Sequence, residues 1–286
     1  PDGATPLHVA AETGQHEAMT LLIRGGINPD QPDAMGNTAL HLAAAANDVY
    51  AVRQLMRSGA SAVAANQQHY TPLHTACASG AIEAAQTLLR AGIPVDINAY
   101  PKDYYPPVYA AMAARQWLVS AWLRNVGAKV SVPDMVRFAD IPGLEEQRLK
   151  DPTQLNRENR TGARPIHQAV VFRQLEVVKY LAEHGYDIDC QNELIEPPLW
   201  LAIYREYWDI AAYLLAMGAD PKKIRPPSNE NLVHAMVKRK QLDALRRCLD
   251  LGVPINAQTI FGFTPLHTAV DTGCFDCLKL LIERGA

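Results

Sequence analysis

The sequence predicts an all-α solenoid, in which a short helix–turn–helix unit is stacked on copies of itself. The tetrapeptide Thr-Pro-Leu-His begins at Thr5, Thr71 and Thr264, and Thr38 begins a close copy of it. The first three copies in chain order start 33 residues apart, and a fixed period of this size is typical of stacked repeats rather than of one globular core. In eight units a glycine follows the first residue of the motif by 21 positions: Gly26, Gly59, Gly92, Gly127, Gly185, Gly218, Gly252 and Gly285.

Each unit carries signals for two short helices. A threonine followed by proline predicts the start of the first helix, because the hydroxyl can cap free backbone N–H groups and proline suits the first helical position. Alanine-rich stretches such as 43–46 keep this helix narrow enough for close stacking. A turn near Gly14 or Gly80 leads to a second helix with leucine pairs at 21–22 and 88–89, and the glycine after it fits a left-handed C-cap.

Divergent motifs fill the same slot elsewhere in the chain. The motif starts lie near 5, 38, 71, 106, 164, 197, 231 and 264. This series of motifs, together with Gly218-Ala219-Asp220 and Gly262-Phe263-Thr264, resembles the ankyrin repeat family over the whole chain. The resemblance implies an α-solenoid of stacked ankyrin-like repeats with β-hairpin fingers. It also implies a structural role for the motif histidines and a concave surface, formed by fingers and first helices, that binds partner proteins.

One stretch interrupts the period. The motif starts at Pro106 and Arg164 are 58 residues apart, which is longer than one repeat. Residues 133–139 and 144–150 predict two short helices, and we interpret 129–156 as a shortened, degenerate unit without its own motif. The chain would then be a single solenoid of about nine units covering all 286 residues, with a local bend at the irregular unit.

Four units lack the motif threonine and have Pro106, Arg164, Pro197 or Asn231 in its place. A lost helix cap costs about 1 kcal/mol. The middle of the stack is therefore predicted to open more easily than the first three units.

The composition fits a scaffold inside the cell. The net charge is −3, and no apolar run approaches the roughly 18 residues of a membrane span. We expect no signal peptide and a cytoplasmic protein, with the nucleus as the alternative. The chain begins within a hairpin at Pro1 and ends after a second helix at Ala286 without a polar end cap, so we expect a piece of a longer protein.

The five cysteines predict no disulfide, since their number is odd: Cys77, Cys190, Cys248, Cys274 and Cys277. The C-x-x-C at 274–277 is compatible with half a zinc site or a redox pair. No second C-x-x-C completes four zinc ligands, and the repeat register places Cys277 at an interior helix position. We therefore interpret the pair as structural core residues.

The sequence predicts no metal, cofactor or enzymatic activity. Six histidines occupy the motif: His8, His41, His74, His167, His234 and His267. Stacked helices lie about 8–10 Å apart, whereas zinc needs each histidine nitrogen at about 2.0–2.1 Å, so neighbouring motif histidines cannot share an ion. No phosphate-loop, dinucleotide, nucleophile-elbow or zinc-protease motif occurs, and an open stack offers a groove rather than an enclosed pocket.

Two surfaces are candidate contact sites for a partner protein. In the first half, small first-helix residues would be flanked by larger candidates: Met35, Leu42, Tyr70, Tyr100, Lys102, Tyr104 and Tyr105. Tyrosine is enriched at interfaces, although these rings could instead brace the prolines of an irregular finger. In the second half the candidates are Phe172, Tyr204, Arg205, Lys238, Arg239, Ile260, Phe261 and Phe263. The apolar residues at 260–261 either meet a partner or pack on the neighbouring finger.

Charge is uneven along the chain. Residues 222–247 hold eight basic residues against Glu230 and Asp243, a net charge of +6. Solvated helix surface is the default interpretation of this basic patch, an acidic protein segment is the next, and nucleic acid is the last.

Two functions remain open at this point. The first is a protein–protein interaction scaffold that binds a partner segment along the groove and the finger tips. The second is a substrate-targeting or autoinhibitory arm of a larger enzyme or effector, with the catalytic domain elsewhere. Neither requires a nucleic acid, a membrane span or a small-molecule substrate.

Overall fold

Helices in pairs make up nearly all of the regular structure. The computed structural model describes residues 3–90, 97–98, 105–194, 196–221 and 230–286. Within these ranges the chain forms eighteen α-helices, one 3-10 helix (η1, Pro152–Asn156) and no β-strand. The predicted all-α repeat fold is confirmed. The described fingers between the pairs are closed by turns rather than by paired strands.

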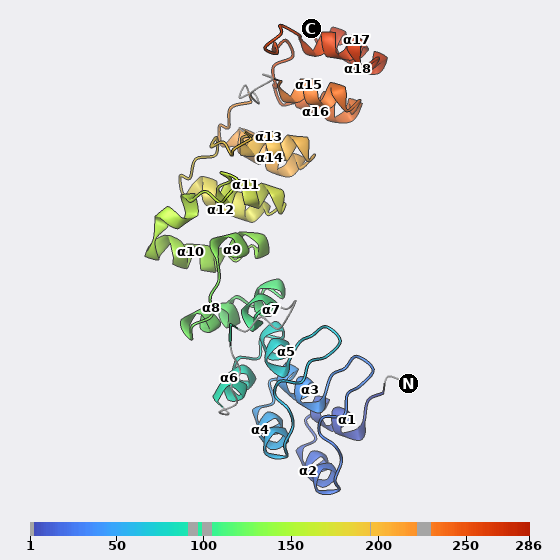
Figure 1. The fold of residues 1–286 in the computed structure, drawn as a ribbon, viewed down its shortest axis with the longest axis vertical. Helices are drawn as coiled ribbons and strands as arrows, with labels where there is room; N and C mark the ends of the chain where they lie inside the picture. The colour runs from blue at the N-terminus through green and yellow to red at the C-terminus, as the bar shows by residue number, and fades with distance from the viewer. Residues whose placement is uncertain (1–2, 91–96, 99–104, 195, 222–229) are drawn as a thin grey trace. The chain divides into compact units, whose positions relative to one another are not determined.

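Each pair consists of an inner helix of seven residues and an outer helix of nine or ten. The inner helices are α1 (Pro6–Glu12), α3 (Ala39–Ala45), α5 (Pro72–Ala78), α7 (Pro107–Ala113), α9 (Val132–Phe138), α11 (Pro165–Val171), α13 (Pro198–Tyr204), α15 (Leu232–Lys238) and α17 (Pro265–Asp271). The outer helices are α2 (His16–Arg24), α4 (Val49–Arg57), α6 (Ile82–Arg90), α8 (Trp117–Asn125), α10 (Ile141–Lys150), α12 (Leu175–Glu183), α14 (Trp208–Ala216), α16 (Leu242–Asp250) and α18 (Phe275–Glu283). Figure 1 shows the pairs in chain order.

The chain divides into two compact units, Pro1–Ser131 and Val132–Ala286. The division falls just before α9, where the 33-residue period is interrupted. Helices α9 and α10 occupy the two stretches predicted as short helices, and begin one and three residues earlier than expected. A single solenoid of nine units with a bend at the irregular one stays a prediction.

The threonine of the motif starts the inner helix as expected. In α1 the Thr5 hydroxyl accepts from the His8 N–H, and Pro6 occupies the first helical position. The prediction of a lost cap is wrong for the unit that starts at Asn231. The Asn231 side chain caps α15 by accepting from the His234 N–H at 3.2 Å. Asparagine caps a helix as well as threonine does, so this unit has not lost its cap.

Small buried residues allow the inner helices to pack closely. Ala43, Ala44, Ala76 and Ala111 are fully buried, and the apolar residue after the motif proline is buried in most units. Seven of the outer helices are followed by a described glycine with positive φ, such as Gly26 at 82° and Gly59 at 90°, which confirms the left-handed C-cap in these units.

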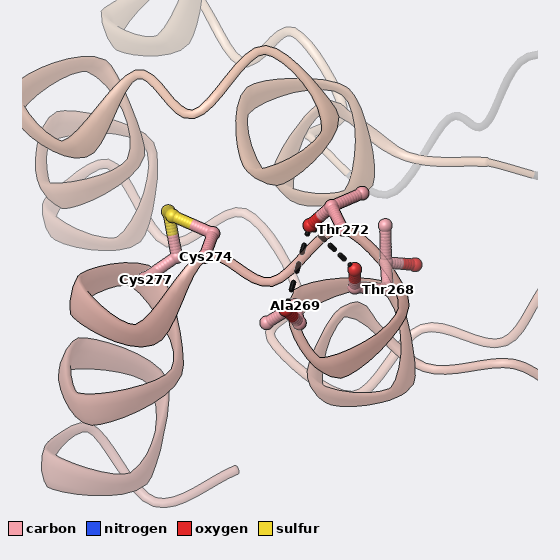
Figure 2. Close-up of a disulfide and its surroundings, with 5 residues drawn as sticks. All are labelled: Thr268, Ala269, Thr272, Cys274 and Cys277. Carbon is pink, nitrogen blue, oxygen red and sulfur yellow. Dashed lines mark hydrogen bonds between the residues drawn. A yellow bond between two sulfur atoms is a disulfide. The ribbon is translucent and has the colours of Figure 1, made fainter.

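Cys274 and Cys277 form a disulfide, so the prediction that the chain has none is wrong. Figure 2 shows the bond at the start of α18, where Cys274 is the N-cap and Cys277 lies one turn further. One helical turn brings the two Cα atoms to 5.3 Å, and such a local pair needs no even cysteine total. Both residues are buried, as the repeat register predicts for Cys277.

The remaining cysteines are free and buried: Cys77, Cys190 and Cys248. Burial raises the pKa of the Cys77 and Cys248 thiols to about 12. Both side chains are therefore neutral thiols at physiological pH and act as apolar core residues.

Candidate protein-binding surface

The motif histidine joins each inner helix to the following finger. In His41, Nδ1 accepts from the Thr38 N–H at 3.1 Å, and Nε2 donates to the Tyr70 carbonyl oxygen at 2.9 Å. The same Nε2 bond joins His8 to Asn37, His74 to Tyr105, His167 to Glu196 and His234 to Phe263. A carbonyl only accepts and a backbone N–H only donates, so the neutral tautomer with a proton on Nε2 satisfies both partners.

Burial favours the same neutral form. Removal from water lowers the pKa of four motif histidines below the usual 6.5: His41, His74, His167 and His234. In the part of the chain described, no group of three His, Cys, Asp or Glu side chains is arranged to hold a metal ion. The histidines therefore position the fingers, which is the structural role that the resemblance implies.

A polar side chain closes each of several fingers and fixes its tip. The Asn66 side-chain oxygen accepts from the N–H groups of Gln68 and Tyr70, both at 2.9 Å. The Thr259 hydroxyl accepts from the N–H groups of Phe261 and Phe263 at 3.3 and 3.1 Å. The side chains at the tips of these two fingers therefore project from an ordered turn.

Neighbouring fingers are also bonded to each other. The Gln67 N–H donates to the Met35 carbonyl at 2.9 Å, and the Glu193 N–H donates to the Thr161 carbonyl at 3.1 Å. Gly36 has a φ of 79°, and a Cβ there would lie 2.8 Å from the Gln67 nitrogen. Glycine at this position is required by both the backbone conformation and the close approach of the next finger.

The first group of predicted contact residues is only partly accessible. Met35 is 57% exposed at a finger tip and Tyr105 is exposed, whereas Leu42 and Tyr70 are half-buried. Tyr70 stacks on His74 with ring centres 5.6 Å apart, and Tyr105 packs against Tyr109 at 5.2 Å. The remaining predicted residues, Tyr100, Lys102 and Tyr104, lie outside the described residues, as do Lys222, Lys223 and Arg225 of the basic patch.

Five residues of the second group lie at the C-terminal ends of inner helices in unit Val132–Ala286, and the other three, Ile260, Phe261 and Phe263, lie on the last finger. Phe172 and Tyr204 are 41% and 39% exposed, and Arg205, Lys238 and Arg239 are exposed. The Arg239 guanidinium lies 4.7 Å from the Tyr204 ring centre and donates through Nη1 to the Tyr204 carbonyl at 2.8 Å. The structure thus brings together two predicted residues that are 35 positions apart in the sequence.

The last finger forms one wall of a pocket with a volume of about 320 Å³. Its lining residues come from the finger, from α15 and the residue Glu230 before it, and from α17: Glu230, Lys238, Thr259, Phe261, Phe263, His267, Thr268 and Asp271. Two of the lining residues, Lys238 and Glu230, form an ion pair. Phe261 is 78% exposed at the tip, so a partner could bury its ring without rearranging the core.

Several residues of this surface were not identified from the sequence. Arg137 lies 5.9 Å from the Phe172 ring centre, and Trp200 stacks on Tyr204 at 4.6 Å. Asp271 and His267 line the pocket. Arg137 and Asp271 lie at the end of an inner helix, whereas Trp200 and His267 occupy the histidine position of the motif in its first turn. The repeat register gives both positions once the helix bounds are known.

Comparisons with known proteins agree with this architecture. The family profile described as "Ankyrin repeats (3 copies)" matches residues 1–66 and 199–286, more than half of the chain. Profiles described as "Ankyrin repeats (many copies)" and "Ankyrin repeat" match residues 166–221 and 68–99. The chain belongs to the ankyrin repeat family. Ankyrin repeats are generally protein–protein interaction modules and are typically non-catalytic.

Curated relatives are longer than the matched region. B-cell lymphoma 3 protein of Homo sapiens is 30% identical over 151 residues, which are 50% of this chain and 33% of that protein. Ankyrin repeat and SOCS box protein 16 of Homo sapiens is 32% identical over 201 residues, 63% of this chain and 43% of that protein. Alpha-latrocrustotoxin-Lt1a of Latrodectus tredecimguttatus is 29% identical over 171 residues, 54% of this chain and 11% of that protein. The chain therefore spans less than half the length of each.

Among the described residues, no helix has both the length and the apolar character needed to span a bilayer.

Proposed function

We propose that this chain is a protein-recognition module that binds a segment of a partner protein through its finger tips and the C-terminal ends of its inner helices. The observation that carries the proposal is the exposed apolar finger Ile260–Phe263. Its two phenylalanines line a pocket of about 320 Å³. The backbone of the finger is ordered, because the Thr259 hydroxyl accepts from the N–H groups of both. Large exposed apolar side chains on an ordered tip are a typical anchor for a partner.

The family supports the same choice of partner class. Because ankyrin repeats generally bind proteins, the partner is another protein or another domain of the same chain, rather than a nucleic acid or a small molecule. Ankyrin repeat domains are commonly intracellular, and on that basis we place the protein inside the cell, in the cytoplasm or nucleus. We assign no catalytic role to the described residues.

A matched pair of variants tests the proposal. Phe261 on the finger before α17 and Phe275 on outer helix α18 are 78% and 73% exposed and belong to the same repeat. Proteins captured from native lysate with the wild-type chain should be lost with Phe261→Ala and kept with Phe275→Ala. Equal retention by both variants would reject the finger as the binding site. Both variants should unfold at the wild-type temperature, since neither ring is buried.

A second candidate function is suggested by relatives in which the matched region is a small part of a longer protein. The matched region is 33% of B-cell lymphoma 3 protein and 8% of the E3 ubiquitin-protein ligase KEG of Arabidopsis thaliana. In such a context the repeats would act as a substrate-targeting or autoinhibitory arm of a larger enzyme or effector. Capture that returns no protein with the wild-type chain would favour this alternative, with the partner being another part of its own chain.

A further inference from the structure

Cationic and aromatic side chains follow one another along the inner-helix ends of unit Val132–Ala286. We call this set the cationic strip, and it consists of Arg137, Phe172, Tyr204, Arg205, Arg239 and Lys240. All six are exposed and lie at or next to the C-terminal ends of α9, α11, α13 and α15. These inner helices pack one against the next, so the six residues share one edge of the unit.

The strip is held in place from within. Arg137 lies 5.9 Å from the Phe172 ring centre, and its carbonyl accepts from the Gln174 side chain at 2.7 Å. The Arg239 guanidinium is fixed against Tyr204 by a hydrogen bond of 2.8 Å and by its place over the ring. Positioned cations lose less conformational entropy on binding than free surface chains do.

In the part of the chain that the structure describes, three cations of the strip, Arg205, Arg239 and Lys240, have no acidic partner. Across the described ranges, no ion pair joins Arg205, Arg239 or Lys240 to a carboxylate. The nearest acidic residue in sequence, Glu206, accepts from the Gln241 side chain at 2.7 Å. Glu206 is one acidic residue beside the four basic residues of the strip, so the strip has an excess of positive charge beside its aromatic rings.

Helix dipoles alone do not account for the strip. Cations are favoured at any helix C-terminus. In the unit Pro1–Ser131, however, the residues that cap the inner helices at the same position are neutral and small: Thr13, Ala46, Ser79 and Ala114. In the second unit the corresponding caps include Phe172, Arg205 and Arg239. Inner helices form with either set of cap residues. The charge is therefore a property of this surface and not a requirement of the repeat.

We propose that the cationic strip binds an acidic protein segment that carries aromatic or aliphatic side chains, an assignment that rests on the function proposed above. Carboxylates would pair with Arg205 and Lys240, and apolar side chains would cover Phe172. Nucleic acid fits less well, because single strands are held by stacking bases on open rings. The Tyr204 ring already has Trp200 stacked at 4.6 Å and Arg239 over it at 4.7 Å.

Binding of defined probes tests the assignment. The probes are a fluorescein-labelled glutamate-rich peptide that contains phenylalanine, the matching lysine-rich peptide and a single-stranded oligonucleotide, measured by fluorescence anisotropy at two salt concentrations. The glutamate-rich peptide should bind most tightly and should weaken as salt rises. The double variant Arg205→Glu, Lys240→Glu should reduce its affinity about tenfold. If that variant does not fold, Arg205→Gln, Lys240→Gln replaces it.

Arg115→Glu is the matched control. Arg115 is exposed, follows α7 and has a φ of 58°, as Lys240 follows α15 with a φ of 55°. It should leave the affinity unchanged. Tighter binding of the lysine-rich peptide or the oligonucleotide, an equal loss with Arg115→Glu, or no binding of the glutamate-rich peptide would overturn the assignment. If a protein captured from lysate is nevertheless lost with Phe261→Ala, the proposed function stands and only the acidic ligand is rejected.

Discussion

His41 donates through Nε2 to the carbonyl oxygen of Tyr70 at 2.9 Å, and this bond connects the start of α3 to the finger that leads into α5. Because Nδ1 of the same ring receives the Thr38 N–H, one side chain couples a helix cap to a neighbouring repeat. The position of a finger, and of the side chains it presents, therefore depends on the histidine of the repeat before it.

Replacing His41 by alanine should lower the free energy of unfolding by about 2–3 kcal/mol, because the Tyr70 carbonyl loses its donor and α3 loses part of its capping box. His267 is the control. Its Nδ1 lies 2.8 Å from the Thr264 hydroxyl, but its side chain is exposed, and within the described residues its Nε2 has no partner. His267→Ala should cost about 1 kcal/mol or less. Urea denaturation measures both, and equal losses would contradict a special role for the bond between repeats.

Stability should fall as the pH falls below about 6.5. Burial lowers the pKa of four histidines in the folded chain from 6.5: His41, His74, His167 and His234. Below pH 6.5 the unfolded chain takes up protons that the folded chain does not, so the unfolded state is favoured. Each histidine contributes at most about 1.4 kcal/mol per pH unit until the folded pKa is passed. Thermal unfolding between pH 7.5 and about 5 measures the trend, and a stability that rises in this window would contradict it.

Two glycines with similar backbone conformation should respond differently to alanine. Gly59 has a φ of 90°, and a methyl group added there would have no atom within 4 Å, so Gly59→Ala should cost about 1–2 kcal/mol from backbone strain alone. At Gly36 the methyl group would also lie 2.8 Å from the Gln67 backbone nitrogen. Gly36→Ala should therefore cost more than Gly59→Ala in thermal unfolding. Indistinguishable losses would mean that contact between fingers contributes little.

Restoring a missing cap should stabilise the second unit. Arg164 stands in the threonine position and makes no side-chain cap, although its N–H donates to His167 Nδ1 at 3.1 Å as in the capped repeats. Arg164→Thr should raise the free energy of unfolding by about 1 kcal/mol. The lost pairs with Glu158 and Asp187 offset little of this gain, because both acidic side chains are more than half exposed.

Hydrogen exchange of α11 provides an independent measurement, because a restored cap should slow exchange in its first turn. Unchanged exchange together with unchanged stability would contradict the predicted weakness of the repeats without threonine. Asn231 should need no such repair, since it already accepts from the His234 N–H.

The repeat pattern in the sequence accounts for most of the fold. The motif threonine and histidine, which are Thr38 and His41 in the second repeat, recur at fixed spacing. Helix starts, turns and C-caps could therefore be located from residue types alone. The disulfide could not be predicted from the number of cysteines, because Cys274 and Cys277 pair within one helical turn. The cap at Asn231 departs from the threonine pattern, because an asparagine side-chain oxygen accepts the same backbone N–H.

The candidate surface was less predictable, because its contacts join residues from different repeats. Arg239 meets Tyr204 only after α13 and α15 pack side by side, and no local pattern reveals such a pair. Tyrosine is a residue type that is common at interfaces, yet the Tyr70 ring stacks on His74 and its carbonyl oxygen accepts from His41. Exposure of Phe261 likewise depends on how the Thr259 turn directs the tip.

Photo-crosslinking from single positions is the most direct test of the claim that the fingers contact a partner protein. A photoreactive phenylalanine analogue at position 261 should crosslink to one protein in native lysate, while the same analogue at position 275, on α18 and nearly as exposed, should give no comparable product. Crosslinks of equal strength from both positions, or from 275 alone, would contradict recognition through the finger.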